Sequence, residues 1–281
     1  MPNHNSATRP FVAGVEPLTG VRVVTIAQNV PGPLAVARLV SEGATAVKVE
    51  PPAGDPLAAM SRDWYDELHA GVSVERLDLK DPQGRARLGD LLRDADLLVT
   101  SHRPSALGRL GLDPAIVFRE APRLRLLRIV GSVGDPDTPG HDLTYQAEAG
   151  LVRTGMPPTL FADVMASERA VSAALLLLGE PAGSVRDVGI SDSLNTLQQP
   201  IRHGLTTATG LLGGGLAYYG VYPTKQGHVA VAALEPHFER RLTDALGLSA
   251  GTELASHLLA RTAVEWEDWA RTRDLPIVAV R

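Results

Sequence analysis

The sequence predicts an α/β protein whose larger, Rossmann-like domain is a doubly wound parallel sheet. Val21–Ile26 is a run of mostly β-branched apolar residues, the pattern of a strand buried on both faces. Apolar residues at helical spacing over Leu34–Glu42 come next, and a second such strand, Ala44–Glu50, follows them. The chain therefore opens with a β-α-β unit, and strands keep alternating with helical segments after it, which favours parallel strands.

This alternation extends to about residue 207. A strand is expected to end at Leu77–Leu79, and an acid followed by a proline marks the start of a helix over Asp81–Arg93. The other predicted strands are Asp96–Thr100, Arg123–Val130 and Val185–Ile190, and the other predicted helices are Pro114–Glu120, Ala162–Leu178 and Ser191–Thr207.

The glycine cluster Gly210–Gly215 separates this pattern from a different one. A hairpin-like pair of strands follows it, then helical segments over Pro236–Arg273 and a short strand at Pro276–Val280. We therefore expect a large α/β domain over residues 1–210, and a smaller α+β domain with a C-terminal return segment over residues 211–281.

Composition excludes several classes of function. The net charge of −5 and the 4 % of aromatic residues argue against nucleic-acid binding. The chain has no cysteine, so thiolate metal sites and cysteine nucleophiles are excluded. No apolar run has the length of a signal-peptide core or a membrane helix, so we expect a cytoplasmic protein without a membrane partner.

The opening unit does not have the pattern of an NAD site. Glu50 ends the second strand where a ribose-binding acid would stand, but only Gly32, between two prolines, lies ahead of the helix. Three spaced glycines are needed there. The cluster Gly210–Gly215 lacks a following Lys-Ser/Thr pair and is expected to be a hinge or flap rather than a phosphate loop.

Three ionisable residues are candidates for chemistry, and each has a structural alternative. His141 lies in a turn before a helix, where Asp142 is the natural cap and the imidazole is then solvated. Asp163 has apolar neighbours at the start of a helix, which fits an N-cap or a carboxyl beside backbone N–H donors. Glu235 follows an apolar strand and precedes Pro236, as an acid in a first helical turn does.

Short segments in a fixed order resemble the family III CoA-transferases. They are Pro17–Val24, Gly32-Pro33, Lys48–Pro52, Gly54-Asp55, Leu77–Lys80, Arg103-Pro104, Leu110–Leu112 and Gly140–Asp142. The resemblance implies this family's fold, coenzyme A as part of an acyl-CoA substrate, no metal or NAD, and an intertwined homodimer. It also implies CoA contacts at Arg103, facing a phosphate, and at Gly32, Lys48 and Asp142.

Two segments are similar to the alpha-methylacyl-CoA racemase branch of that family. They are Gly140–Tyr145 and Tyr222–Phe238. The resemblance implies that Asp163 is a nucleophile in transferases and an acid or base in racemases. It further implies that His141 is the opposing base and that Glu235 orients its imidazole.

The resemblance leaves three functions open. Epimerisation at C2 of a 2-methylacyl-CoA needs proton removal on one face and delivery on the other, with N–H donors at the start of the helix near Asp163 stabilising the enolate. CoA transfer needs Asp163 to attack the thioester and form an aspartyl-CoA intermediate. A catalytically reduced CoA-binding homologue or subunit is the third.

Several positions depart from the family's pattern. Ala58 and Val72 stand where basic residues usually face the CoA nucleotide, and Met165–Ser167 replace expected glycines after Asp163. The chain also stops soon after Pro276–Val278, where relatives continue. These departures motivate the third hypothesis.

Overall fold

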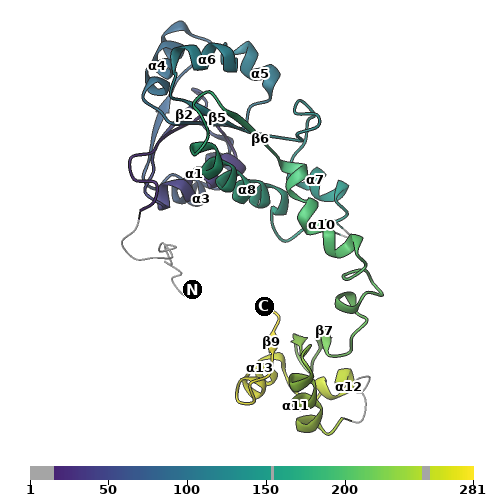
Figure 1. Ribbon diagram of the computed structural model, residues 1–281. Helices are drawn as coiled ribbons and strands as arrows, with labels where there is room; N and C mark the ends of the chain where they lie inside the picture. Colours follow the sequence, from purple (N-terminus) through teal and green to yellow (C-terminus); the bar gives the residue numbers. More distant parts are fainter. Residues whose placement is uncertain (1–15, 153–154, 249–253) are drawn as a thin grey trace. The chain divides into compact units, whose positions relative to one another are not determined.

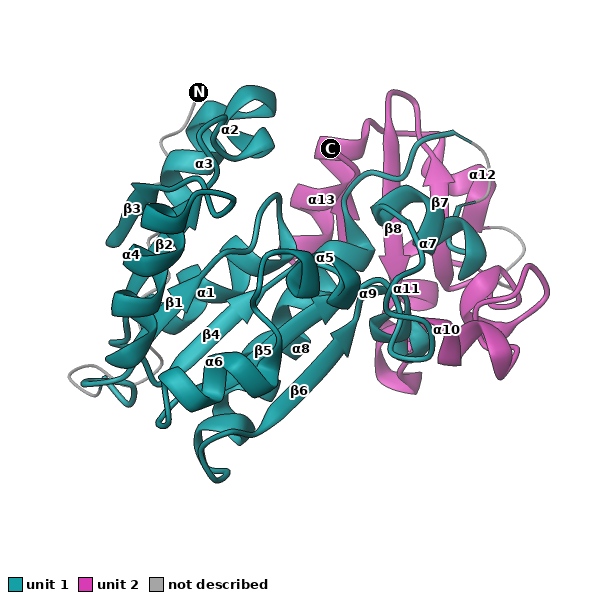
Figure 2. Ribbon diagram, turned by 90° about the horizontal axis from the view of Figure 1, so that it is seen from above, with its two compact units in different colours: residues 1–196 teal, residues 197–281 magenta. Residues whose placement is uncertain are grey.

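The chain folds as two units, Met1–Thr196 and Leu197–Arg281, which Figure 2 shows in teal and magenta. This computed structural model describes residues 16–152, 155–248 and 254–281. The predicted domain boundary, after residue 210, falls inside the second unit.

The first unit is built on a six-stranded sheet in which every neighbouring pair is parallel. The strands lie in the order β3-β2-β1-β4-β5-β6, so the doubly wound parallel sheet predicted from the sequence is confirmed. Their bounds are Arg22–Thr25 (β1), Thr45–Glu50 (β2), Val72–Arg76 (β3), Leu97–Thr100 (β4), Arg125–Val130 (β5) and Val185–Gly189 (β6).

Helices cover both faces of this sheet: α1 and α8 lie on one face, and α4, α5 and α6 on the other (Figure 1). In chain order the helices are Pro31–Ser41 (α1), Pro56–Met60 (α2), Arg62–Leu68 (α3), Pro82–Arg93 (α4), Pro104–Arg109 (α5), Pro114–Glu120 (α6), Asp142–Glu148 (α7), Phe161–Leu178 (α8), Ile190–Ser193 (α9) and Asn195–Arg202 (α10).

Three of these helices begin with the same Asp-Pro pair. The aspartate stands at the N-cap and accepts a backbone N–H from the second helical residue in α2, α4 and α6. The proline occupies the first helical position, where a missing N–H costs nothing. This local chemistry explains why the start of α4 was predictable within one residue.

The long helix α8 packs closely on α1 and on the sheet because its buried face is made of small residues. Ala162, Ala166, Ala170 and Ala174 recur every four residues, and each is fully buried. The first turn of α8 is thereby fixed near the end of β5, where the candidate site lies.

The structure differs from the sequence-based prediction in three respects. Strand β3 ends at Arg76 instead of Leu79, because Asp78 accepts the N–H groups of Lys80 and Asp81 and turns the chain. The predicted helix Ser191–Thr207 is two helices, α9 and α10, which meet at Leu194. The short helices α2, α3 and α5 were not predicted.

The second unit is a smaller α+β layer. Strands β7 (Tyr219–Pro223), β8 (His228–Ala232) and β9 (Ile277–Ala279) form an antiparallel sheet in the order β7-β8-β9. The helical elements of this unit are η1 (Leu211–Gly213), α11 (Pro236–Leu246), α12 (Leu254–Leu258) and α13 (Ala263–Arg271). Trp266 is buried in its core and donates its indole N–H to the Leu258 carbonyl at 2.8 Å.

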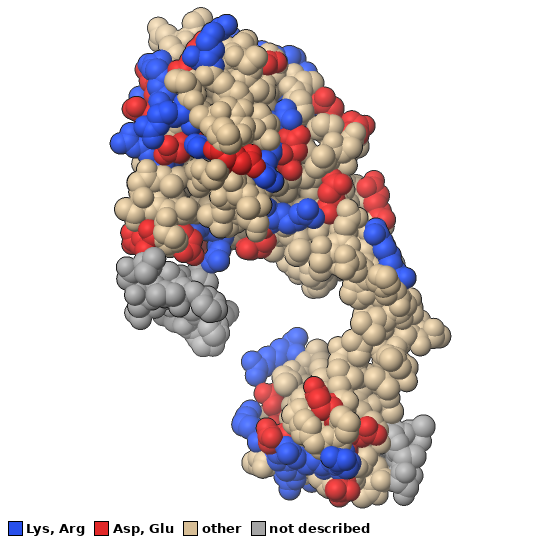
Figure 3. All heavy atoms as spheres, viewed as in Figure 1, with Lys and Arg blue, Asp and Glu red and all other residues tan. Residues whose placement is uncertain are grey.

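The surface carries both signs of charge. Figure 3 shows acidic side chains lying among the basic ones on the visible face of each unit. Within the described ranges, no helix combines the length and the apolar character that crossing a bilayer requires.

Candidate active site

The carboxyl edge of the parallel sheet carries a cavity of about 130 Å³. Strands β1 and β4 are neighbours, and the connections that follow them run to opposite sides of the sheet, which opens a crevice at this edge. The cavity is lined by Ile26, Gln28, Val49, Glu50, Pro51, Leu77, Asp78, Leu79, Lys80, His102 and Leu110. These residues follow β1, β2, β3 and β4 or stand at their ends, so the cavity is where a doubly wound fold places a ligand.

The polar groups that line this cavity include charged and uncharged side chains. Gln28 donates its backbone N–H to the Ser101 hydroxyl at 3.0 Å, which joins the loops after β1 and β4. Burial holds the pKa of His102 below its usual range, so its imidazole is neutral at pH 7. Lys80 is exposed at the rim and supplies a positive charge.

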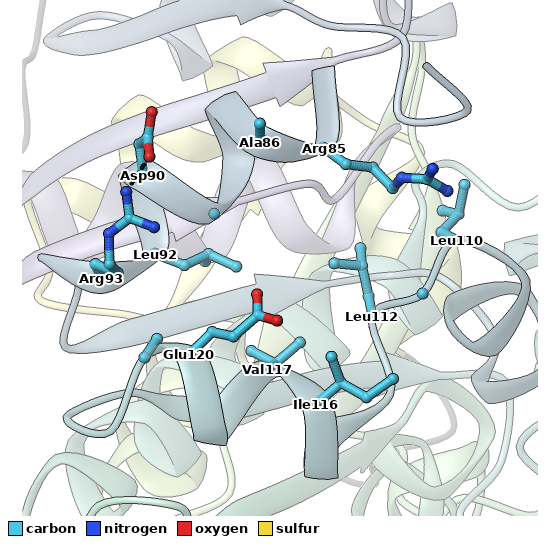
Figure 4. A pocket seen from close by; sticks show the side chains of 13 residues that line it. Arg85, Ala86, Asp90, Leu92, Arg93, Leu110, Leu112, Ile116, Val117 and Glu120 are labelled. Carbon is cyan, nitrogen blue, oxygen red and sulfur yellow. Dashed lines mark hydrogen bonds and ion pairs between the residues drawn. The ribbon is translucent and has the colours of Figure 1, made fainter. Parts of the chain in front are cut away.

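A second hollow, of about 390 Å³, lies between α4 and α6. Figure 4 shows Arg85 extending toward Leu110, while Arg93 pairs with Asp90. Leu110 lines both hollows. The floor of this groove is apolar, with Leu92, Leu112 and Val117, and the described residues of the groove bring together no set of groups that would support catalysis.

Asp142 joins helices α7 and α8. It is the first residue of α7, yet its carboxylate serves α8: Oδ1 accepts the backbone N–H groups of Ala162 at 2.9 Å and of Asp163 at 3.1 Å. Oδ2 accepts from Gln146 Nε2 at 2.5 Å. Asp142 was expected to cap its own helix or to contact CoA, but it is only 6 % exposed and is engaged in these bonds.

Asp163 lies in the first turn of α8 and is half-buried. Burial raises the pKa of its carboxyl to about 7, and the nearby charge of Asp142 adds to the shift. It is the third residue of the helix and not its N-cap, which is Leu160. A carboxyl with this pKa exchanges a proton readily near neutral pH.

The start of α8 does not offer its N–H groups as the sequence analysis expected. Those of Ala162 and Asp163 donate to Asp142, and that of Val164 donates to the Leu160 carbonyl. The expectation that this turn stabilises an enolate is therefore wrong for these three donors, because protein groups already accept their hydrogen bonds.

His141 lies beside Asp142 in the chain and stands at the N-cap of α7. Its side chain is exposed, and its backbone N–H donates to the Thr144 hydroxyl at 3.1 Å. Because Asp142 in turn bonds to the Asp163 backbone, the fold brings the segments of His141 and Asp163 together at one end of α8.

The loop before His141 packs on Tyr145, which is buried. A Cβ added at Gly140 would lie 2.3 Å from the Tyr145 hydroxyl oxygen, and one added at Gly131 would lie 2.6 Å from the same atom. A residue with a Cβ at either position would collide with the Tyr145 side chain, so the two glycines allow the loop that leads to His141 to pack against it.

Glu235 belongs to the second unit. It is the N-cap of α11, it is exposed, and its backbone carbonyl accepts the N–H groups of Phe238 and Glu239. Its predicted role of orienting His141 stays a prediction.

Lys48 was expected to contact CoA, and the structure places it in the interior with no exposed surface. Its ammonium lies 2.5 Å from Asp55 Oδ2, 3.3 Å from Glu50 Oε1 and 2.8 Å from His69 Nε2. Tyr65 completes this group, because its hydroxyl donates to Glu50 Oε1 at 2.7 Å. In this arrangement the Lys48 ammonium has no surface available to a ligand.

The same group contains the residues best suited to a metal ion among those described. Oxygen and nitrogen atoms of Glu50, Asp55 and His69 lie within 4.8 Å of one another. The Lys48 ammonium bonds to all three, so it already supplies the positive charge that a metal would bring.

The two remaining predicted CoA contacts lie near the carboxyl edge of the sheet. Arg103 is exposed at the N-cap of α5, directly after His102. Gly32 is buried in the first turn of α1, where an added Cβ would lie 2.1 Å from the Ala27 Cβ, so close packing requires the glycine. Gln28, His102 and Lys80 were not among the site residues predicted from the sequence. Each lies just beyond a predicted strand, which is the signal that could have indicated them.

Residues 18–272 match the model of CoA-transferase family III. Alpha-methylacyl-CoA racemase of Homo sapiens is 31 % identical over 255 residues, which cover 82 % of this chain and 65 % of the human protein. Cinnamoyl-CoA:phenyllactate CoA-transferase of Clostridium sporogenes is 32 % identical over 157 residues, 51 % of this chain and 37 % of that protein. The chain thus spans less than two thirds of either relative.

The crystal structure of the Mycobacterium tuberculosis protein Rv3272 has the same fold. It superposes with a TM-score of 0.82 at 24 % identity, over 95 % of this chain and 86 % of that one.

Proposed function

Because the chain belongs to CoA-transferase family III, the family that the sequence resembles, we propose that it acts on an acyl-CoA thioester and epimerises C2 of a 2-methylacyl group. Asp163 and His141 are the acid–base pair in this proposal. Glu235 orients the His141 imidazole.

The feature that carries the proposal is the environment of Asp163, a half-buried carboxyl in the first turn of α8 whose backbone N–H donates to Asp142. Burial and the charge of Asp142 raise the pKa of its carboxyl to about 7. A group that must take a proton in one direction and give it in the other works best when its pKa lies near the working pH. A nucleophilic carboxylate has no such need, because it must be ionised to attack.

The reaction then moves one proton on each face of C2. In one direction the Asp163 carboxylate takes the C2 proton, and the C–H electron pair moves into the thioester as an enolate. Protonated His141 then gives its proton to the opposite face of C2, which restores the thioester with inverted configuration. In the other direction neutral His141 takes the proton and the Asp163 acid gives one.

In this proposal the CoA nucleotide occupies the cavity between β1 and β4. The apolar side chains of Ile26, Val49 and Leu110 suit the face of a base, while Lys80 and Arg103 offer cations for phosphates. In this proposal Lys80 and Arg103 supply the positive charge that Ala58 and Val72, at usually basic positions, do not supply.

CoA transfer is the second candidate, and the similarity to the Clostridium sporogenes transferase favours it. Asp163 would attack the thioester carbon and expel CoA as a thiolate, forming a mixed anhydride. The thiolate would then attack the Asp163 carbonyl, which releases the donor's acyl group as a carboxylate and leaves an aspartyl-CoA thioester.

The experiment is deuterium incorporation at C2 of a 2-methylacyl-CoA in heavy water. We expect exchange in both epimers with the wild-type protein, loss of epimerisation in Asp163→Asn and in His141→Ala, and unchanged exchange in Glu168→Gln. Each of the first two variants should keep exchange only in the epimer whose C2 proton the remaining residue takes. Glu168 is the matched control because it is an exposed acid on the same helix.

Epimerisation that survives His141→Ala would contradict the acid–base pair. Hydroxylamine trapping of a modified Asp163 with an acyl-CoA donor, without C2 exchange, would instead support the transferase. Calorimetry that detects CoA-thioester binding with neither activity would favour a reduced, binding-only homologue.

Location and assembly belong to the same proposal. We propose a cytoplasmic homodimer, and light scattering of the purified protein tests the dimer, with a monomeric mass as the contrary result.

A further inference from the structure

Two carboxyl groups lie together at the start of α8, and they have different surroundings. Among the described residues, the groups that hydrogen-bond to the carboxylate of Asp142 are N–H donors: those of the Ala162 and Asp163 backbones at 2.9 and 3.1 Å, and that of the Gln146 amide at 2.5 Å. An ionised carboxylate accepts such bonds with both oxygens, whereas a protonated one would bring a donor against a donor.

The orientation of the Gln146 amide is fixed independently. Its Nε2 also donates to the Thr159 carbonyl at 3.0 Å, and a carbonyl only accepts. Turning the amide over would place Oε1 against this carbonyl, so Nε2 must face Asp142. Gln146 has no exposed surface, and its Oε1 is a buried atom without a protein hydrogen-bond partner. The amide of Gln146 therefore donates to Asp142 although its own oxygen has no hydrogen-bond partner among the described residues.

The carboxyl of Asp163, in contrast, has no such set of donors among its described contacts. It is half-buried and close to a negative charge, and both raise its pKa. That charge is Asp142, the first residue of α7. The charge of Asp163 in turn raises the pKa of the Tyr145 hydroxyl, which the charge of Arg103, at the N-cap of α5, lowers.

We propose that Asp142 is a positioning residue whose carboxylate fixes the first turn of α8 and places a negative charge beside the carboxyl of Asp163. Environments that separate two neighbouring carboxyls divide their roles in this way. Asp142 is then not a CoA contact. Its effect on the reaction rests on the proposed function, but the charge arrangement itself does not.

The test is a pH titration of the wild-type protein by ¹³C NMR, with aspartate labelled at the side-chain carboxyl. The Asp163 signal is assigned by its loss in Asp163→Asn, and the Asp142 signal by its loss in Asp142→Asn. We expect Asp163 to titrate near pH 7 and Asp142 to keep the chemical shift of a carboxylate across that range.

Two variants separate charge from structure. In Asp142→Asn the Asp163 midpoint should move to lower pH, because the neighbouring negative charge is gone. In Gln146→Met, which keeps that charge, the Asp163 midpoint should move less. A purely structural role would move both alike or neither, and that outcome overturns the proposal.

The wild-type titration is decisive even where Asp142→Asn does not fold, because Asp142 is then assigned from the signal that is lost in Asp142→Glu. An Asp142 carboxyl that takes up a proton near neutral pH, or an Asp163 that is already ionised at pH 5, would overturn the inference. Separate titrations without any C2 exchange would instead leave this inference standing and count against the proposed function.

Discussion

The ammonium of Lys48 lies 2.5 Å from Asp55 Oδ2, and both side chains are completely buried. Asp55 uses its other oxygen to accept the backbone N–H groups of Asn29 at 3.0 Å and Leu57 at 2.9 Å. Asn29 has a positive φ of 63°, which a residue with a side chain adopts at some cost. The pair therefore holds the loop after β1 in the conformation that shapes the carboxyl edge of the sheet.

Removing one partner of this pair should be strongly destabilising. Asp55→Ala leaves the Lys48 charge buried with less compensation, and such losses cost about 3 to 5 kcal/mol. Urea denaturation measures the change in the free energy of unfolding. The control is Glu75→Ala, which breaks the more exposed pair with Arg87 and should cost less than about 1 kcal/mol. Equal losses in the two variants would contradict the importance of burial.

His69 should make stability depend on pH. Its Nδ1 lies 2.5 Å from the Tyr65 carbonyl and its Nε2 accepts from Lys48, so it must be neutral to make both bonds. Burial, and then the Lys48 charge, hold the pKa of His69 below the ordinary 6.5. The unfolded chain therefore binds more protons as the pH falls. The stabilisation is fully present above pH 6.5 and is lost as the pH falls toward the lower folded pKa.

The measurement for His69 is thermal unfolding of the wild type and of His69→Gln between pH 7.5 and 5. The wild type should lose more stability over this range than the variant, whose neutral amide oxygen still accepts from Lys48. A residual slope in both is expected, because burial also lowers the pKa of His102. Parallel pH dependences would show that the pKa of His69 is the same in the folded and the unfolded chain, which would contradict the prediction.

Gly140 should tolerate no side chain. In Gly140→Ala the new methyl would lie 2.3 Å from the Tyr145 hydroxyl oxygen, so either the ring or the loop must shift. Crowding of this kind costs about 1 to 3 kcal/mol, and here it also displaces His141. We expect a lower melting temperature and reduced C2 exchange. Gly134→Ala in the same loop is the control, since its nearest neighbour would be Ser132 Oγ at 3.9 Å.

Lys80 should contribute to CoA affinity. Lys80→Ala removes a cation from the rim of the cavity between β1 and β4, and one charged hydrogen bond to phosphate is worth about tenfold in Kd, or about 1.4 kcal/mol. Calorimetry with CoA measures it, and the loss should shrink at high salt. Arg119→Ala, an exposed cation on α6, should leave the affinity unchanged. The same Kd in both variants would remove Lys80 from the nucleotide site.

Features encoded by nearby residues were predictable from the sequence. The apolar run Val21–Ile26 contains β1, and the acid at Asp81 gave the start of α4. The role of Asp142 was not predictable in this way, because the backbone groups it binds, those of Ala162 and Asp163, lie some twenty residues further along the chain. The burial of Lys48 was not predictable for the same reason. Nothing near it in the sequence indicates that Asp55 and His69 converge on its ammonium and allow it to be buried.

The family and the candidate acid were predictable from motifs, but the environment of the acid was not. The segment around Asp163 placed it at the start of a helix, and α8 begins two residues before it. Its raised pKa, however, depends on burial and on the charge of Asp142, which only the packing of α7 against α8 creates.

The pH dependence of kcat/KM should separate the two candidate reactions. Epimerisation requires the Asp163–His141 pair to hold one proton, on Asp163 for one epimer and on His141 for the other. These two forms have the same number of protons, and the equilibrium constant between the epimers does not depend on pH. Both epimers should therefore show the same bell-shaped profile, whose limbs belong to the pair rather than to either residue.

CoA transfer requires only an ionised Asp163. Because the pKa of Asp163 lies at about 7, the transfer rate should rise through neutral pH and then level off. The decisive comparison is the alkaline side, measured from pH 5 to 10 with one acyl-CoA in both assays. A fall in C2 exchange at high pH with both epimers supports proton transfer by the pair. A plateau in product formation that depends on Asp163 and not on His141 supports Asp163 as a nucleophile.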